Sequence, residues 1–153
     1  MDTKQVIVLR QDLIKNIDGV ELNKVISRAV NASISSLLKL FTLESITTLP
    51  GGILEPGQEY IRIYTQFGSD TVLSSWLFGE KLTKILCVPG EAELSKLYDR
   101  LCNSGDDFIP FALISESNLS NSGIPVNICL GIGPYLNDVI DKYLDGFPLI
   151  YSI

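Results

Sequence analysis

Hydrophobic positions along the first part of the chain follow two different periods. Residues 6–9 are four consecutive aliphatic side chains, and a run that is apolar on both faces predicts a strand buried between two layers. Between residues 22 and 38 the aliphatic positions recur three and four residues apart, which is typical of an amphipathic helix. Asp18 and Glu21 precede this stretch with the spacing of a capping box, so they predict where the helix begins.

The second half of the chain repeats this alternation of strand and helix patterns. Apolar runs at 81–88, 108–114 and 125–132 predict three further strands, and residues 91–103 and 136–144 have helical spacing. Loops rich in glycine, proline, serine and asparagine separate these elements. This order predicts an α/β sandwich, a single three-layer domain in which helices cover both faces of a small mixed β-sheet with four main strands.

Residues 43–80 are the least regular part of the chain, because prolines and glycines interrupt them. Within this segment residues 60–65 alternate between polar and apolar side chains, which predicts an edge strand with Ile61 and Ile63 on one face. No linker is long enough to separate two domains. We therefore interpret residues 1–153 as one domain, in which 43–80 is an insertion or diverged segment packed at one edge.

The charge of the chain restricts its partners. Twelve basic and eighteen acidic side chains give a net charge of −6, and an acidic protein repels phosphate, which disfavours non-specific nucleic-acid binding. Residues 1–42 carry six basic and four acidic side chains, so a basic patch near the N-terminus remains available for a specific contact. The chain contains no histidine, which removes every Ser-His-Asp, Cys-His and His–metal mechanism.

Other sequence signals predict neither a membrane segment nor a cofactor. The longest apolar runs are far shorter than the ~18 residues of a spanning helix, and the strand pattern follows Met1 without a signal peptide, so we expect a cytoplasmic protein. Cys87, Cys102 and Cys129 lack C-x-x-C spacing and lie in apolar segments, which indicates buried reduced thiols. Residues 131–134, GIGP, lack the third glycine of a nucleotide-binding loop and indicate a strand-to-helix turn. We expect no metal and no cofactor.

Four motifs along the chain occur in an order known from one family. KQVIVLRQDL at 4–13 contains R-x-D-L at the end of a strand, and KI at 84–85 precedes ELSKLY at 93–98. ISESNLS at 114–120 and GIGP…VIDK at 131–142 follow. In type and order these motifs resemble those of type II peptidyl-tRNA hydrolases, whose closing motif is A-I-G-P…I-D-K-V.

The resemblance covers residues 4–42 and 81–151 and implies a type II peptidyl-tRNA hydrolase-like fold. It also implies a hydrolase that acts in translation on the ester bond between a peptide and tRNA. A poorly characterised sister group of this fold keeps an asparagine on the first helix, as Asn23 does here, and is an alternative relative.

The chain departs from this family at the residues that line the active face. In the family these are the Lys, Gln and His of G-K-x-A-A-Q-x-x-H, and neither of two alignments preserves the set. One alignment places Arg28 at the His, whereas the other places Lys24 at the Gln and Ser27 at the His. In the later motif Glu116 replaces the family's Asp and Ser120 replaces its Thr, so an acid and a hydroxyl survive in kind.

The surviving polar residues define the candidate site. Hydrolysis of the peptidyl-tRNA ester requires activation of water and a positive group or amide that stabilises the oxyanion. The resemblance implies Glu116 as the base or water-positioning group, Ser120 as its hydrogen-bonding partner, and a basic side chain as the cation. Asp12 follows the first strand, at the strand end where α/β sheets place their sites. The candidate catalytic residues are Glu116, Ser120, Lys24 and Arg28, and the candidate substrate-binding residues are Asp12, Lys15 and Asn23.

Two functional hypotheses follow. The first is an esterase that acts weakly on peptidyl-tRNA or a smaller acyl substrate. The second is a non-catalytic binding or regulatory module, because the family's Lys, Gln and His are missing. Under either hypothesis the loop after the first strand, the helix at Lys24 and Arg28, and residues 116–120 should border one cleft. Each candidate residue also has a purely structural interpretation, in which it orders a loop, caps a loop or lies on a solvated helix face. The sequence also leaves open whether the protein forms a homodimer.

Overall fold

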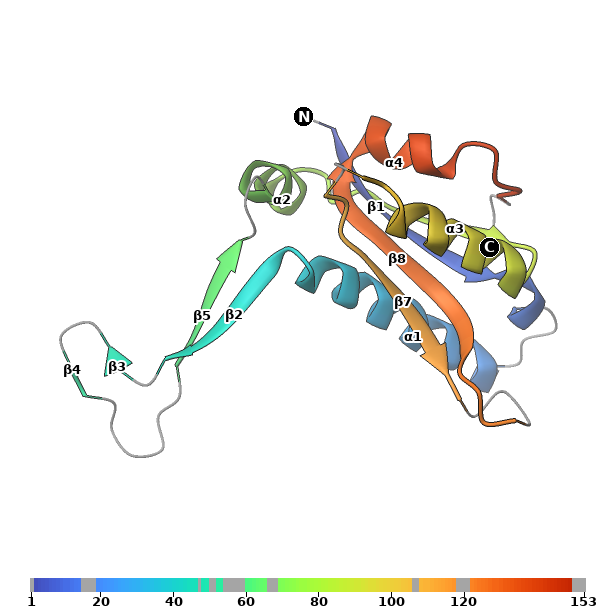
Figure 1. Cartoon of the computed structure of the whole chain (residues 1–153), viewed down its shortest axis with the longest axis horizontal. Helices are drawn as coiled ribbons and strands as arrows, with labels where there is room; N and C mark the ends of the chain where they lie inside the picture. The colour runs from blue at the N-terminus through green and yellow to red at the C-terminus, as the bar shows by residue number, and fades with distance from the viewer. Residues whose placement is uncertain are drawn as a thin grey trace.

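The centre of the protein is a four-stranded mixed sheet in a computed structural model (Figure 1). Strand β1 (Thr3–Arg10) runs parallel to β6 (Thr83–Val88) and antiparallel to β8 (Val126–Leu136). The remaining strand, β7 (Phe111–Glu116), pairs with β8, so the order is β6-β1-β8-β7. These are the four strands that the apolar runs predict, and the predicted fold class is confirmed. The structure describes residues 2–14, 19–46, 48–49, 52–53, 60–65, 69–105, 108–117 and 122–149.

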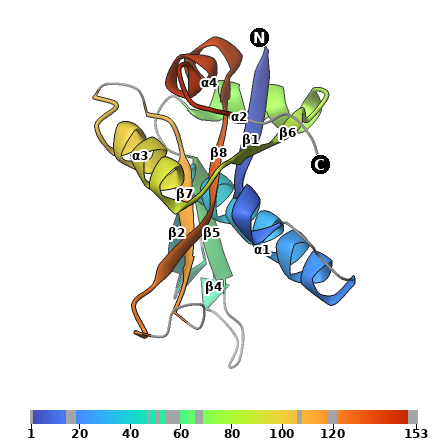
Figure 2. The same ribbon diagram turned by 90° about the vertical axis from the view of Figure 1, so that its right-hand side faces the viewer.

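The two faces of the sheet bury separate hydrophobic clusters. Along β1, Val6 and Val8 pack with leucines of helix α3 (Glu91–Cys102) and with Ile140 of α4 (Asn137–Leu144). The alternate residues Ile7 and Leu9 pack on the other face with Val25 and Ala32 of α1 (Gly19–Leu38). Helices α3 and α4 therefore cover one side of the sheet and α1 covers the other (Figure 2). A fourth helix, α2 (Ser69–Phe78), contacts β8 and β1.

Helix α1 approaches the backbone of β8 closely at Gly131. A Cβ atom at this position would lie 2.1 Å from the carbonyl oxygen of Ala32 and 3.0 Å from Oγ of Ser36. Since no real Cβ contact is shorter than about 3.0 Å, only glycine allows α1 to lie this near the sheet. Ala32 and Ser36 are fully buried as a result.

A separate β-hairpin extends away from the main sheet and the helices that cover it (Figure 1). It pairs β2 (Phe41–Ile46) with β5 (Tyr60–Thr65), and the short strands β3 (Thr48–Leu49) and β4 (Gly52–Ile53) pair with each other. The strand expected over 60–65 is present, with Ile61 and Ile63 at alternate positions opposite Ser45 and Leu43. It does not add to the main sheet. The later part of the segment 43–80 forms α2, which packs against the main sheet.

Two sequence predictions need correction. Residues 131–134 were expected as a turn, but β8 continues through them to Leu136. Gly133 takes a positive φ of 88°, and the register with β1 shifts between Lys4 and Val6, so the strand accommodates the irregularity without ending. Cys87 and Cys129 are buried thiols as expected, whereas Cys102 is exposed at the end of α3.

In the described part of the chain, no helix is long and apolar enough to span a bilayer.

Candidate functional site

An ion pair joins α1 to the end of β7. The guanidinium of Arg28 donates two parallel hydrogen bonds to Glu116, from Nε to Oε1 at 2.7 Å and from Nη2 to Oε2 at 2.8 Å. Only 11% of the Arg28 side chain and 27% of the Glu116 side chain are exposed. A bidentate pair of this kind is stronger and more specific in geometry than a single-point contact. The position and orientation of both groups are therefore well defined.

Local periodicity explains why these two side chains meet. Arg28 lies on α1 between the buried residues Val25 and Ala32, on the flank of the helix that faces β7. Along β7, Ile114 packs in the cluster beneath α1, and the strand period of two places Glu116 on the same side. The pair therefore lies on the α1 face of the sheet.

The charges at this site lower the pKa of Glu116. The hydrogen bonds from Arg28 are the largest cause, burial partly opposes them, and the charges of Arg28 and Lys24 lower the pKa further. Lys24 itself is exposed one turn before Arg28. At neutral pH the carboxyl group is thus ionised and a weak proton acceptor, suited to hold a water molecule or a cation by hydrogen bonding and charge.

A buried thiol lies directly behind the pair. Sγ of Cys129 on β8 is 3.3 Å from the carbonyl oxygen of Arg28 and donates a hydrogen bond to it. Burial raises the pKa of Cys129 to about 12, so the thiol stays protonated at neutral pH. Because the thiolate is the nucleophilic form, Cys129 is a packing residue here.

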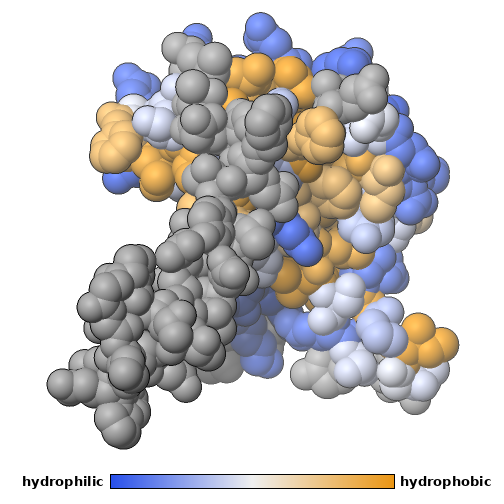
Figure 3. Space-filling model, turned by 60° about the vertical axis from the view of Figure 1, so that its left-hand side comes forward, coloured by the Kyte–Doolittle hydropathy of each residue, from blue (hydrophilic) through white to orange (hydrophobic). Residues whose placement is uncertain are grey.

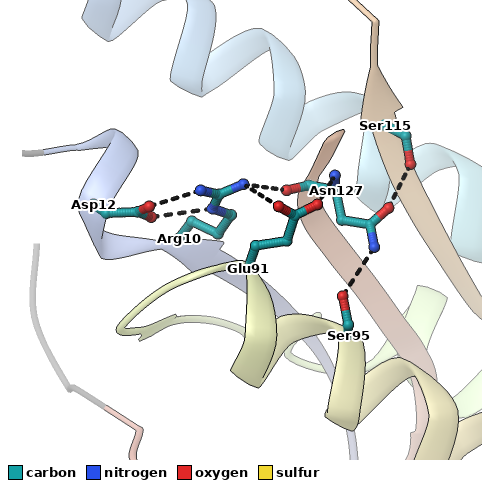
Figure 4. Close-up of polar contacts among 6 residues, drawn as sticks. All are labelled: Arg10, Asp12, Glu91, Ser95, Ser115 and Asn127. Carbon is teal, nitrogen blue, oxygen red and sulfur yellow. Dashed lines mark hydrogen bonds and ion pairs between the residues drawn. The ribbon is translucent and has the colours of Figure 1, made fainter. Parts of the chain in front are cut away.

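A second polar cluster lies at the end of β1 and extends toward α3 (Figure 4). Arg10, buried at the end of β1, donates to both carboxylate oxygens of Asp12 at 3.0 and 2.6 Å and to the carbonyl oxygen of Asn127 at 2.9 Å. Glu91 on α3 lies 3.7 Å from Arg10 and accepts a hydrogen bond from the backbone N–H of Asn127 at 2.9 Å. The hydrogen bonds from Arg10 hold the pKa of Asp12 below its usual range.

The side chain of Asn127 extends this cluster toward β7. Its Nδ2 donates to Oγ of Ser95 at 3.0 Å, and its Oδ1 accepts from Oγ of Ser115 at 2.9 Å (Figure 4). Ser115 directly precedes Glu116, so the cluster fixes the backbone that carries the ion pair. We refer to this set, Arg10, Asp12, Glu91, Ser95, Ser115 and Asn127, as the Arg10 cluster.

The structure places the predicted site residues in two groups. It brings Arg28 and Glu116 into contact, with Lys24 close enough for its charge to act on the carboxylate. Asp12 instead pairs with Arg10 in the Arg10 cluster. Arg10 and Arg28 nevertheless line one small cavity at the end of β1, together with Leu13 and Ile14 of the following turn. Asn23 is exposed on α1. The remaining two candidates, Lys15 and Ser120, lie outside the described residues.

Sequence reasoning did not single out the other members of the Arg10 cluster. Arg10 carried one signal, because a charged residue that ends an otherwise aliphatic buried strand needs partners. The two partners from distant elements, Glu91 and Asn127, had no comparable signal. No group of three or more potential metal ligands occurs in the part of the chain that the structure describes.

The Arg28–Glu116 pair makes stability depend on pH. The folded-state pKa of Glu116 is lowered from its ordinary value of 4.5, so the pair stabilises the fold above that pH, and the stabilisation is lost as the pH falls through the lowered pKa. We expect the difference in unfolding free energy between the wild type and Glu116→Gln to be largest near neutral pH and to shrink on acidification below 4.5. Urea denaturation at a series of pH values measures it. With Arg28→Ala as the background, the same substitution should show little of this dependence; an equal dependence there would contradict the assignment.

The comparison with protein families covers almost the entire chain. The family model described as peptidyl-tRNA hydrolase PTH2 matches residues 3–150. The chain belongs to the PTH2 family. The match confirms the resemblance found in the sequence motifs, and it includes the segment 43–80, which those motifs did not cover. No curated protein shows significant similarity to the chain. Membership in the PTH2 family supports a peptidyl-tRNA hydrolase-like function.

Proposed function

We propose that this PTH2-family protein slowly hydrolyses the ester bond between a peptide and tRNA, or a related acyl ester. The observation that carries the proposal is the bidentate contact between Arg28 and Glu116 at the position where the family resemblance expects an acid. Around it, Lys24 adds a second positive charge. An acid and two cations next to each other supply the minimum that ester hydrolysis needs.

Each group has a defined task in this reaction. The Glu116 carboxylate accepts a hydrogen bond from a water molecule and orients its oxygen toward the acyl carbon. As the bond between the water oxygen and the acyl carbon forms, negative charge develops on the carbonyl oxygen. The positive charges of Arg28 and Lys24 stabilise this charge. The bond to the ribose oxygen then breaks, one proton of the attacking water ends on that oxygen, and the other is released to solvent. The products are a peptide with a free carboxylate and a tRNA with a free hydroxyl.

The same geometry explains why turnover should be slow. Both oxygens of Glu116 already accept hydrogen bonds from Arg28, and its pKa is lowered, so it takes up a proton from water poorly. The Lys, Gln and His of ordinary family members are also replaced. The proposal includes a cytoplasmic location, where tRNA substrates are available.

A non-catalytic binding module is the second candidate function. The observation that favours it is that Arg28 already occupies both carboxylate oxygens of Glu116. The ion pair therefore has a structural role, in which it holds α1 against β7, that requires no catalysis. Helix α1 also presents a stripe of aliphatic side chains, each about half exposed, to solvent. Such an apolar helix face supports the homodimer that the sequence left open. The stripe consists of Leu22, Ile26, Val30, Ile34 and Leu38.

Turnover of peptidyl-tRNA by the wild type and by Glu116→Gln distinguishes the two functions. If Glu116 orients water, the wild type should release free peptide above the uncatalysed rate. Glu116→Gln should be slower by about 10²-fold, the low end of the range for one positioned acid–base group, because the lowered pKa makes Glu116 a weak base. Asp138→Asn is the matched control, because it alters an exposed carboxylate on α4, which covers the face of the sheet opposite α1. A wild-type rate no faster than the uncatalysed one would leave the binding module as the function. Equal rates for the wild type and Glu116→Gln above that level would contradict the role assigned to Glu116.

A further inference from the structure

A long groove follows the open edge of the sheet. Strand β7 is an edge strand, since β8 pairs with one of its sides and it ends the strand order. A cavity of about 660 Å³ lies along it, between the end of α1 and the side of α3. Hydrophobic side chains form a broad patch on this side of the molecule (Figure 3). The groove is lined by residues 108–114, by Tyr98 of α3, and by Ser35, Lys39 and Leu40 at the end of α1.

The backbone of β7 presents hydrogen-bonding groups to this groove. The N–H of Gly133 donates to the carbonyl oxygen of Pro110 at 2.7 Å, so in an antiparallel ladder the even-numbered positions 110, 112 and 114 face β8. The N–H and C=O groups of Phe111 and Leu113 therefore point to the open side. An extended peptide can pair with them by adding a strand to the sheet.

The walls of the groove suit the side chains of such a peptide. Tyr98 and Phe111 stand edge to face with ring centroids 5.7 Å apart, and Phe108 is 81% exposed beside them. Among the described residues that line the groove, Lys39 alone is charged. This lining favours neutral or acidic peptides with apolar residues and disfavours basic ones.

The groove leads to the ion pair described above. Helix α1 contacts β7 along its length, with Arg28 at Glu116 and Lys39 in the groove beside the start of the strand. Strand β7 runs from Phe111 at the groove to Glu116 at the pair. A peptide that lies parallel to β7 thus has its C-terminal end, the end that carries the ester in a peptidyl-tRNA, at the Arg28–Glu116 pair.

We propose that the groove along β7 binds the peptide part of the substrate as an added parallel strand and delivers its C-terminal acyl carbon to the Arg28–Glu116 pair. This proposal rests on the proposed function for its orientation. The binding of the peptide itself requires no catalysis. Substrates with several apolar residues should consequently bind better than tRNA that carries a single amino acid.

The test is the binding of a hydrophobic N-acetylated pentapeptide amide, followed by fluorescence anisotropy and by NMR of backbone amides. We expect the amide signals of Phe111 and Leu113 to shift on addition of this peptide. Leu113→Pro removes an N–H that the ladder with β8 does not use, whereas Leu113→Ala keeps it. Because one hydrogen bond contributes about 1 kcal/mol, Leu113→Pro should bind roughly fivefold or more weakly than Leu113→Ala. Thermal unfolding checks that both variants fold.

The outcomes separate this proposal from the proposed function. Equal affinities for the two folded variants, or amide shifts that avoid β7, would overturn strand addition even if the protein hydrolyses peptidyl-tRNA. Peptide binding at β7 that persists in Glu116→Gln, without any hydrolysis by the wild type, would support the groove and reject the esterase. In an active enzyme, a KM that does not change with peptide length would contradict the delivery of the acyl carbon from the groove.

Discussion

Replacing Arg28 with alanine is expected to lower kcat on peptidyl-tRNA by about 10²–10³-fold, the usual effect of removing one oxyanion-stabilising group. Arg28 is also the group that holds Glu116 in position, through both of its carboxylate oxygens. Its loss removes a positive charge and a positional constraint together. The KM should change much less than kcat, because the groove along β7 is left intact.

Two further variants sharpen the interpretation of Arg28→Ala. Arg28→Lys keeps the charge but cannot form two parallel hydrogen bonds, so it should recover only a small part of the lost rate. Lys24→Ala removes an exposed charge from the same helix and should cost roughly fivefold or less in rate, because an exposed charge interaction contributes about 1 kcal/mol at most. If Arg28→Ala stays within threefold of the wild type while the wild type is active, another group provides the positive charge.

Replacing Gly131 with valine is expected to give the largest loss of stability. The new Cβ would lie 2.1 Å from the backbone oxygen of Ala32, and backbone cannot move aside as a flexible side chain can. Overpacking of this kind typically costs 1–3 kcal/mol and occasionally more, and we expect about 3 kcal/mol here. For a protein of this size that corresponds to a fall in Tm of roughly 6–12 °C.

The displaced helix carries Arg28, so Gly131→Val should also weaken the contact with Glu116. Thermal unfolding followed by circular dichroism measures the first effect, and loss of the pH dependence described for Glu116→Gln reports the second. Gly90→Ala is the control, since a Cβ there meets only the Glu93 side chain at 3.6 Å and Asp12 at 3.9 Å. A Tm for Gly131→Val that matches this control would show that α1 can shift away from the sheet without penalty.

Periodicity in the sequence was sufficient to predict the fold because burial on the two faces of β1 produces it. Val6 and Val8 face one cluster and Ile7 and Leu9 the other, so both sets must be apolar. The same reasoning fails for β8, where Gly133 interrupts the pattern although the strand continues. Its continuation depends on pairing with β1, a contact between residues far apart in the chain.

The candidate site was only partly predictable. Glu116 and Arg28 came from aligned motifs, since no local pattern links two residues 88 positions apart. Asp12 illustrates the limit of spacing arguments. It follows a strand end, as site residues often do, but a short 3₁₀ turn, Gln11–Leu13, brings it back onto Arg10. Which face of the sheet such a side chain reaches depends on the conformation of that turn.

The central position of the first strand determines when the protein can fold during its synthesis. Val6 pairs with Lys84 on one side and with Ile132 on the other, so its second partner is translated 126 residues after it. At about 5–20 residues per second the ribosome needs on the order of ten seconds to cover this interval. Throughout that time an aliphatic strand lacks its antiparallel neighbour and resembles the segments that chaperones protect from aggregation. A nascent chain that stops before β8 leaves β1 without its antiparallel partner, so the sheet cannot be completed until β8 has been translated.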